Sequence, residues 1–545
     1  MEDQIKYGID RSRDFLKHIW KEALHQRGGS GKEAVFRLAR DPATYEIKII
    51  SSVKLADYHK ITHQADWELL KKFAQPLKGK TVVFINSTMV GGGVAMLRPP
   101  LTHLLNRLGI NAHWYVLEDL PNVYLKNPFE FTKMMHNILQ RRSSEHLTRE
   151  GKEAHKLLCE QNFQVLKKQQ PIVDADVIVL DDTQPAPLFR MLKQINPKAK
   201  WIWRDHMDTS HTLMSRPGTP QAEVASYILD ELGIKQVNAF VTHPVDEFVL
   251  PGTENKTYFV PATIDLFDDL NRELTVPSIK EGISFINHQI FLKNFNLYLR
   301  DQVSRVSLRR PRIVLIARFD ESKGMDIALR LGVAARNALK KAGVRGRALP
   351  QIIIAGNGSI DDPSGERIYK DMLRLRRNYP RDLNDIIIIR LKHNYGAVNA
   401  LMNPLPRKNG EETCVIGLQT SLAEGLETRV SDWIHHGIPV VISNRGGMSL
   451  QVKEGMSGII LDYNQPDYDI NRGAEFIAST MLDKDKYKAF RNSTKWQAQD
   501  YTTREFTTSA NAIRWTRIFG RVLSGKHADR KWMLTGSSST QHRLP

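Results

Sequence analysis

The sequence predicts an α/β protein made of two doubly wound parallel sheets. Two series of short, β-branched apolar runs occur along the chain, and helical stretches separate the runs within each series. Apolar strands alternating with helices are typical of parallel sheets that helices cover on both faces. The length of 545 residues is too great for one ordinary core and suits two large domains facing one another.

Residues 1–77 are predicted to form a helical accessory segment that caps the first domain. Apolar residues recur at helical spacing near Phe15 and Ile19, and again between Trp67 and Phe73. Such spacing is typical of amphipathic helices with one apolar face. Between these two stretches, residues 45–50 have the composition of an edge strand.

The first Rossmann-like domain is assigned to residues 78–262. Its strands are expected at the apolar runs 81–85, 112–116, 176–180, 201–203 and 239–242. Hydrophobic periodicity then fades, so residues 263–310 are predicted to be a linker or hinge.

The second Rossmann-like domain is assigned to residues 311–483. Its strands are expected at the runs 312–317, 351–356, 386–389, 413–417 and 439–443. Residues 484–525 have the pattern of helices long enough to cross back to the first domain. The polar residues 526–545 are predicted to be a disordered tail.

The chain is strongly basic, with 78 lysine and arginine residues, 60 aspartate and glutamate residues and a formal net charge of +18. Such a charge favours nucleic acid, anionic lipid or phosphorylated substrates as partners. No basic tract interleaved with aromatic residues and no nucleic-acid motif occurs, so nucleic acid is not expected. Anionic lipid and phosphorylated substrates remain as possible partners.

Cysteine usage and hydropathy indicate a cytoplasmic protein without a membrane span. The two cysteines, Cys159 and Cys414, lie far apart in sequence, which argues against a disulfide framework or a zinc cluster. No apolar run is long enough to cross a bilayer, and the first residues lack the pattern of a secretory signal. The sequence does not determine the oligomeric state, and a homodimer is compatible with it.

The loop after the first strand is the first candidate ligand site, because ligands of open α/β sheets bind beyond the carboxyl ends of strands. Gly91, Gly92 and Gly93 allow backbone amides to approach an anion, and the following helix adds a partial positive charge. The spacing is neither a dinucleotide fingerprint nor a P-loop, and a turn without a ligand stays open. Pro99 and Pro100 should kink or shorten this helix.

Two cations follow the first strand of the second series. Arg318 and Lys323 stand five residues apart in the loop before the next helix. Fixed cations there suit the neutralisation of a departing phosphate or diphosphate. Solvated surface cations are the alternative.

Carboxylates and glycines follow the fourth and fifth strands of the second series. Glu424 precedes a helix, and Asp432 lies about two turns into it. A carboxylate accepts several hydroxyl hydrogen bonds, which suits sugar or ribose recognition. Gly446 and Gly447 follow the next strand and form a further candidate anion-binding turn.

Polar side chains also follow two neighbouring strands of the first series. Arg204 and His206 come directly after one strand, and Asp181 and Gln184 after the other. A structural histidine is the alternative for His206. No hydrolytic triad or metal-ligand motif is present, so we expect neither a metal ion nor a cofactor.

Taken together, these motifs resemble those of retaining GT-B glycosyltransferases, the large family that includes sucrose and glycogen synthases. Within it, the trehalose phosphorylase and trehalose glycosyltransferring synthase group is most similar. The resemblance extends over residues 80–461 and rests on segments 91–95, 129–137, 203–206, 261–271, 317–320, 323–324, 355–363, 419–421, 424–425 and 446–447.

The resemblance implies GT-B architecture, with the acceptor on the first domain and the donor on the second. The glycine loop would contact the donor phosphate and sugar, and His206 would bond the donor glucose near its C6 hydroxyl. Arg318 and Lys323 would hold the leaving phosphate, and Glu424 would bind sugar hydroxyls. It also implies a front-face reaction that retains anomeric configuration, with the departing phosphate helping to deprotonate the acceptor.

The implied activity is reversible transfer of glucose to glucose, which makes or phosphorolyses trehalose. The donor is glucose 1-phosphate or a nucleoside-diphosphate glucose. Asp432 stands where the family has glutamate, which favours the phosphate donor, and Ala423 and Asp269 are further departures. A catalytically silent relative that binds sugars or polyanions, and a transferase with another acceptor, remain as alternatives.

Overall fold

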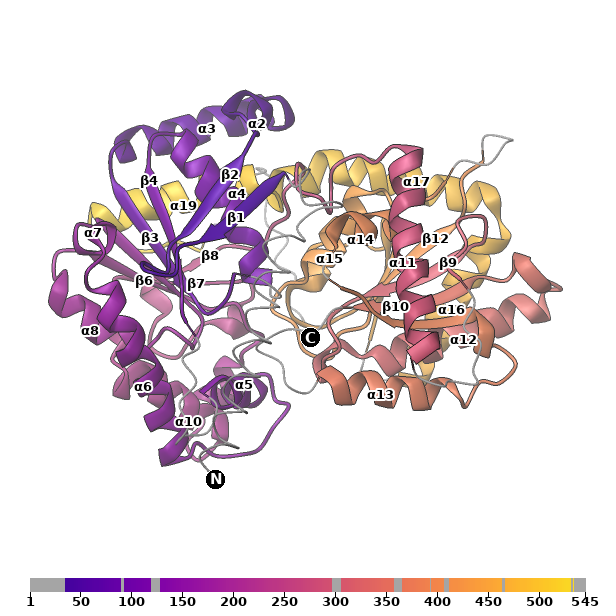
Figure 1. Ribbon diagram of the computed structural model, residues 1–545, viewed down its shortest axis with the longest axis horizontal. Coiled ribbons are helices and arrows are strands. Elements are labelled where there is room, and N and C mark those ends of the chain that lie inside the picture. Colours follow the sequence, from indigo (N-terminus) through magenta and orange to yellow (C-terminus); the bar gives the residue numbers. More distant parts are fainter. Residues whose placement is uncertain are drawn as a thin grey trace.

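Two six-stranded parallel sheets lie side by side in the computed structural model, each flanked by helices (Figure 1). This arrangement confirms the predicted α/β class with two doubly wound domains. The structure describes residues 35–89, 93–118, 128–296, 305–356, 365–392, 394–405, 411–462, 466–530 and 533.

The first sheet has the strand order β4-β3-β5-β6-β7-β8, and every neighbouring pair is parallel. Its strands are β3 (Thr81–Asn86), β4 (Asn111–Val116), β5 (Val177–Asp181), β6 (Lys200–Arg204), β7 (Ala239–Thr242) and β8 (Thr257–Phe259). The chain moves to opposite sides of β3 when it forms β4 and β5. This reversal creates a crevice at the carboxyl end of β3.

The second sheet repeats the same plan, with the order β11-β10-β9-β12-β13-β14 and parallel pairing throughout. Its strands are β9 (Arg312–Ile316), β10 (Gln351–Gly356), β11 (Ile386–Arg390), β12 (Val415–Gln419), β13 (Val440–Ser443) and β14 (Gly458–Leu461). Here the reversal occurs at β9, which is followed by the two predicted cations.

Successive side chains of a strand point to opposite faces of its sheet, and here the side chains on both faces are apolar. Both faces of each sheet are therefore covered by helices. In β3, Val82 and Phe84 enter one apolar core with α3, α4 and α19 (Thr508–Leu523), whereas Val83 and Ile85 enter another with α5, α6 and α8. The helices of this half are α2 (Leu55–Ile61), α3 (Gln64–Ala74), α4 (Gly93–Arg107), α5 (Pro128–Leu139), α6 (Arg149–Leu166), α7 (Gln170–Val173), α8 (Leu188–Ile195), α9 (His211–Met214) and α10 (Pro220–Ser226).

Helix α4 continues through Pro99 and Pro100 to Arg107, so the expected shortening does not occur. Each proline removes one backbone donor from the helix. Both prolines are buried, and α4 packs against β4 and α19. Tertiary packing of the apolar face therefore stabilises the helix despite the missing hydrogen bonds.

The described part of the segment before β3 contains both strands and helices. The strand predicted at residues 45–50 is present as β2 (Ile47–Ser51), and it pairs antiparallel with β1 (Phe36–Arg40), which was not predicted. The expected helix near Trp67 is present as α3. The predicted helix near Phe15 lies outside the described residues.

The predicted linker at 263–310 contains a helix, α11 (Val276–Asn296), which corrects that part of the prediction. Ile279, Ile283 and Ile286 are buried in the core of the second half. A Cβ on Gly282 would lie 2.6 Å from the Cβ of Ala400, so α11 approaches α14 very closely. Apolar residues on several sides of α11 obscured its helical period in the sequence.

The remaining helices complete the second half and return the chain to the first. They are α12 (Met325–Lys341), α13 (Gly365–Arg376), α14 (Tyr395–Met402), α15 (Thr428–His435), α16 (Pro466–Leu482), α17 (Lys484–Gln497), α18 (Thr503–Glu505) and α19 (Thr508–Leu523). Helix α19 packs against α3 and α4, far from α17 in Figure 1. None of the described helices combines the length and apolar character that a membrane span requires.

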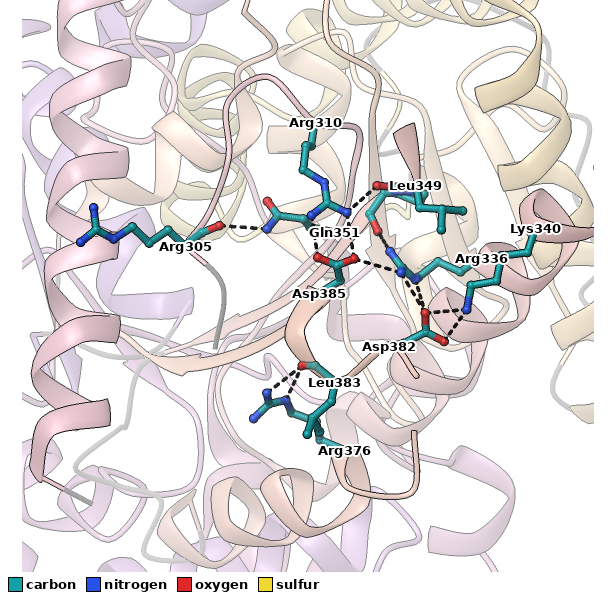
Figure 2. A network of polar contacts seen from close by, with 11 residues as sticks. Arg305, Arg310, Arg336, Lys340, Leu349, Gln351, Arg376, Asp382, Leu383 and Asp385 are labelled. Carbon is teal, nitrogen blue, oxygen red and sulfur yellow. Dashed lines mark hydrogen bonds and ion pairs between the residues drawn. The ribbon is translucent and has the colours of Figure 1, made fainter. Parts of the chain in front are cut away.

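A network of ion pairs lies at the amino end of the second sheet, opposite the loops that carry the candidate site (Figure 2). Asp382 accepts hydrogen bonds from Arg336 and Lys340, and Asp385 accepts them from Arg310 and Arg336. These contacts join α12 to the segments that precede β9 and β11. Part of the positive charge of the chain therefore has a structural role.

Candidate functional site

A cavity of about 250 Å³ lies between the two sheets, at the loops that follow their switch-point strands. Loops after β3, β5 and β6 line one wall. The end of β10 and the loops after β9, β11 and β12 line the other. The predicted site residues that line it are Gly93, Asp181, Gln184, His206, Arg318, Lys323 and Glu424. Arg318 and Glu424 therefore share one crevice. Gly91 and Gly92 lie outside the described residues.

On the first wall, His206 is a neutral imidazole held by a buried carboxylate. Its Nε2 lies 3.0 Å from Oδ1 of Asp181, which also accepts hydrogen bonds from Arg98. Burial and the nearby charge of Arg204 lower the pKa of His206 to about 4. Burial alone would raise the pKa of Asp181, but Arg98 and His206 outweigh this effect and lower it below its usual value. Because Asp181 is ionised, Nε2 must be the donor, which leaves Nδ1 as an acceptor.

Backbone conformation fixes this histidine further. Asp182 follows β5 with φ at 65°, a left-handed conformation that aspartate tolerates better than most residues. Its Oδ1 accepts a hydrogen bond of 2.9 Å from the backbone N–H of His206.

The buried Oε1 of Gln184 has no hydrogen-bond partner among the described residues, although Gln184 lines the cavity. A polar atom therefore remains for a ligand beside the histidine.

Arg204 does not line the cavity; it lies fully buried at the end of β6. Its guanidinium donates to the backbone oxygen of Thr242 at 3.2 Å and lies 3.4 Å from Nδ1 of His243. Burial and the charge of Arg98 lower the pKa of Arg204 to about 9. Arg204 thus supports the wall from behind.

On the second wall, Lys323 is bonded to two carboxylates. Its Nζ donates to Glu424 and to Glu427, with 2.7 Å between Nζ and Oε2 of Glu427. Burial alone would lower the pKa of Lys323, but the two carboxylates outweigh this effect and raise it. Arg318 lines the same wall, and its charge acts on Lys323 in the opposite direction.

The two glutamates share this ammonium group, and their pKa values shift in opposite directions. Burial raises the pKa of Glu424 above its usual value. Burial would raise the pKa of Glu427 as well, but Lys323 outweighs this effect and lowers it. Since the two carboxyl groups titrate as a pair, a proton taken up by the pair resides mainly on Glu424. Glu424 can then donate as well as accept a hydrogen bond.

Direct contacts join the two walls. Lys133 of α5 lies 2.6 Å from Asp320 in the loop after β9, and both line the cavity. The backbone N–H of Glu424 donates to Oδ2 of Asp208 at 3.1 Å, and Arg141 pairs with the same carboxylate at 2.6 Å. The position of Glu424 therefore depends on both halves of the molecule.

Three other predicted residues are not brought to the cavity. Asp432 is fully buried within α15, where it pairs with Arg429. A Cβ on Gly446 would lie 1.5 Å from the backbone oxygen of Glu424, and the N–H of Gly447 donates to the oxygen of Gly425. The glycine pair thus packs against the Glu424 loop, and neither glycine lines the cavity.

Sequence reasoning missed several cavity residues, namely Lys133, His136, Asp320, Tyr395, Glu427 and Arg429. Two signals were available in the sequence. Lys133 and His136 belong to the segment 129–137 that contributed to the resemblance. Glu427 stands three residues after Glu424, directly before a helix, where acidic residues are favoured. Among the described residues, no cluster of three histidine, cysteine or acidic side chains is arranged to hold a metal ion.

The family model and the relatives found by comparison with known proteins all carry names that refer to trehalose. The family described as "Trehalose synthase, N-terminal domain" matches residues 84–250. A trehalose phosphorylase of Pleurotus sajor-caju is 28% identical over 499 residues, covering 88% of this chain and 63% of that protein. A trehalose synthase of Pyrococcus horikoshii is 28% identical over 422 residues, covering 76% of this chain and 87% of that protein.

The fold has counterparts among solved structures. The UDP-forming trehalose-phosphate synthase of Burkholderia xenovorans superposes with a TM-score of 0.55 at 14% identity, covering 81% of this chain and 99% of that one. At 14% identity, this likeness shows the fold alone. The match spans less than two thirds of the length of the phosphorylase. The chain is thus a relative of the trehalose phosphorylases and trehalose synthases, built on the GT-B fold.

Proposed function

We propose that this chain is a retaining hexosyltransferase that makes or phosphorolyses trehalose. It would transfer glucose between glucose 1-phosphate, or a nucleoside-diphosphate glucose, and a second glucose. The observation that carries this proposal is the shared cavity, which Arg318, Lys323 and Glu424 line on one wall and His206 lines on the other. The named activities of the relatives at 28% identity support the same substrates.

Each wall supplies one part of the proposed reaction. Loss of a sugar phosphate leaves negative charge on the departing oxygen, and fixed cations stabilise that charge most in a cavity shielded from water. Arg318 and Lys323 would have this role. His206, neutral and oriented by Asp181, would bond a hydroxyl of the donor hexose, and Glu424 would bond others. The departing phosphate would accept the proton of the incoming hydroxyl on the same face of the sugar.

Glucose 1-phosphate is the donor that we propose first. A nucleotide donor needs an acceptor for its ribose hydroxyls, and Asp432, at the position implied for this role, is buried against Arg429 and away from the cavity. Cys159 and Cys414 form no disulfide with each other, which fits a reducing compartment such as the cytoplasm.

Incubation of the purified chain with trehalose and inorganic phosphate tests this proposal. We expect release of glucose 1-phosphate and glucose, and a loss of at least about 100-fold in the rate for Arg318→Ala. Synthesis of trehalose from UDP- or ADP-glucose, without phosphorolysis, would reverse the choice of donor. Absence of both reactions would reject the transferase.

A catalytically silent sugar-binding relative is the second candidate. The bonding of Lys323 by two carboxylates favours it, because these acids occupy a cation that the reaction needs. Calorimetric titration with glucose and glucose 1-phosphate, run beside the turnover assays, separates the two candidates. Binding without turnover of any donor supports the silent protein.

A further inference from the structure

Glu427 occupies two groups that would otherwise receive an anion. The first is the ammonium of Lys323, at 2.7 Å from Oε2 of Glu427. The second is the amino terminus of α15, where the other oxygen of Glu427 accepts a hydrogen bond of 3.2 Å from the N–H of Arg429. A helix amino terminus and a lysine are both ordinary phosphate-binding groups.

The same carboxylate faces the cavity. Glu427, Thr428 and Arg429 all line it, so the first turn of α15 is directed at the space where substrates would lie. The side chain of Glu427 is 12% exposed, and that of Lys323 is 10% exposed. Their interaction is therefore only weakly screened by solvent. The cation of Arg429 is itself paired with Asp432 and does not replace Lys323.

Carboxylates already offset the two cations to which we assign the phosphate. Arg318 and Lys323 contribute two positive charges, and Glu424 and Glu427 contribute two negative charges when both are ionised. A phosphate added to this wall meets at least one carboxylate that already holds Lys323. Like charges brought together in a shielded site oppose binding strongly.

We propose that Glu427 competes with the donor phosphate for Lys323 and for the amino terminus of α15, and thereby sets the affinity of the site for anions. This inference rests on the proposed function, because it assumes that a phosphate enters this cavity. Phosphate binding would require Glu427 to release Lys323. Neutral sugars make no such demand, so their binding should not depend on the charge of Glu427.

Calorimetric titration of the full chain with inorganic phosphate, and separately with glucose, tests this inference. Glu427→Gln keeps the shape of the side chain and removes its charge. Glu427→Asn is also neutral and retains a favoured helix cap, which guards against a failure of folding in the first variant. Both variants should bind phosphate about tenfold more tightly than the wild type, with unchanged affinity for glucose.

Glu321→Gln is the matched control. It removes a negative charge from the segment that contains Lys323, but Glu321 pairs with Arg367 and does not line the cavity. Its phosphate affinity should equal that of the wild type. An equal gain in Glu321→Gln, or no gain in either Glu427 variant, would overturn the inference.

The two proposals fail in different ways. Phosphorolysis by the wild type, together with unchanged phosphate affinity in both Glu427 variants, would reject the role of Glu427 and keep the transferase. Tighter phosphate binding in these variants, with no turnover of any donor, would support the role of Glu427 and reject the transferase.

Discussion

Single residues near the carboxyl ends of β5 and β6 decide the chemistry of the first wall. Asp181 is fully buried and bonds both Arg98 and His206, so one carboxylate orients the imidazole and neutralises a buried guanidinium. Buried charges are tolerated only when they are paired in this way. Asp181 binds no substrate directly in our proposal. It nevertheless controls the orientation of His206, which does.

Asp181→Asn should destabilise the protein by about 3 kcal/mol, because it leaves a buried guanidinium without its counter-charge. The measurement is the free energy of unfolding in urea at pH 7. Glu153→Gln is the control, since Glu153 pairs with Arg149 on the surface at 2.8 Å. That change should alter stability by no more than about 0.5 kcal/mol. Equal losses in the two variants would contradict the assigned role of Asp181.

A second residue-scale prediction concerns His155, which is fully buried between Tyr227 and the backbone oxygen of Gln184. Burial lowers its pKa to about 4, so between pH 6.5 and pH 4 the unfolded chain binds a proton that the folded chain does not. The contribution of His155 to the stability of the fold therefore decreases as the pH falls through that window. Buried carboxyls with raised pKa values change stability in the opposite direction. The contribution of His155 must therefore be measured as the difference in stability between the wild type and a variant without this histidine.

His155→Gln isolates the contribution of that histidine. The stability advantage of the wild type over this variant should shrink by on the order of 1 kcal/mol for each pH unit between 6.5 and 4. Urea denaturation at four pH values in this range provides the measurement. A constant difference would show that His155 is accessible to protons in the folded state.

At the scale of elements, the short helical turn after β13 positions the loop after β12. Gly446 has φ at 56°, and its α-carbon faces the backbone of Glu424 so closely that no side chain fits between them. The sequence placed this glycine pair correctly at the carboxyl end of a strand. Its role as a support for another loop depends on packing between two segments, which the local sequence does not encode.

Gly446→Ala should therefore lower both stability and activity. Overpacking against Glu424 should lower the free energy of unfolding by about 1–3 kcal/mol beyond the strain of the backbone conformation. Displacement of Glu424 should also reduce kcat/KM by about tenfold or more. Gly455→Ala is the matched control, because Gly455 has φ at 79° but nothing within 4 Å of an added Cβ. Equal effects at the two positions would reject the packing argument.

At the scale of the whole molecule, the cavity exists because the two halves are held in contact. Lys133 and Asp320 pair across it, and α19 returns to pack on α3 and α4 of the first half. Contacts across such a crevice exclude water and complete the constellation of side chains when the halves approach.

Lys133→Ala should weaken this contact and lower kcat/KM by on the order of tenfold, with partial rescue in Lys133→Arg. Small-angle scattering should show a larger radius of gyration in Lys133→Ala than in the wild type. Lys80→Ala is the control, because Lys80 pairs with Asp176 within the first half. A normal radius and normal kinetics in Lys133→Ala would show that this pair does not hold the halves together.

By itself, the sequence determined the α/β class, the two parallel sheets and the edge of each sheet at which a ligand would bind. It could do so because strand and helix periods are local, and because parallel strands direct their carboxyl ends to one edge. Only the tertiary structure decided that Lys323 bonds Glu427, that Asp432 turns away from the cavity and that α11 packs as a helix. These outcomes depend on contacts between segments far apart in the chain, whose energies no local pattern records.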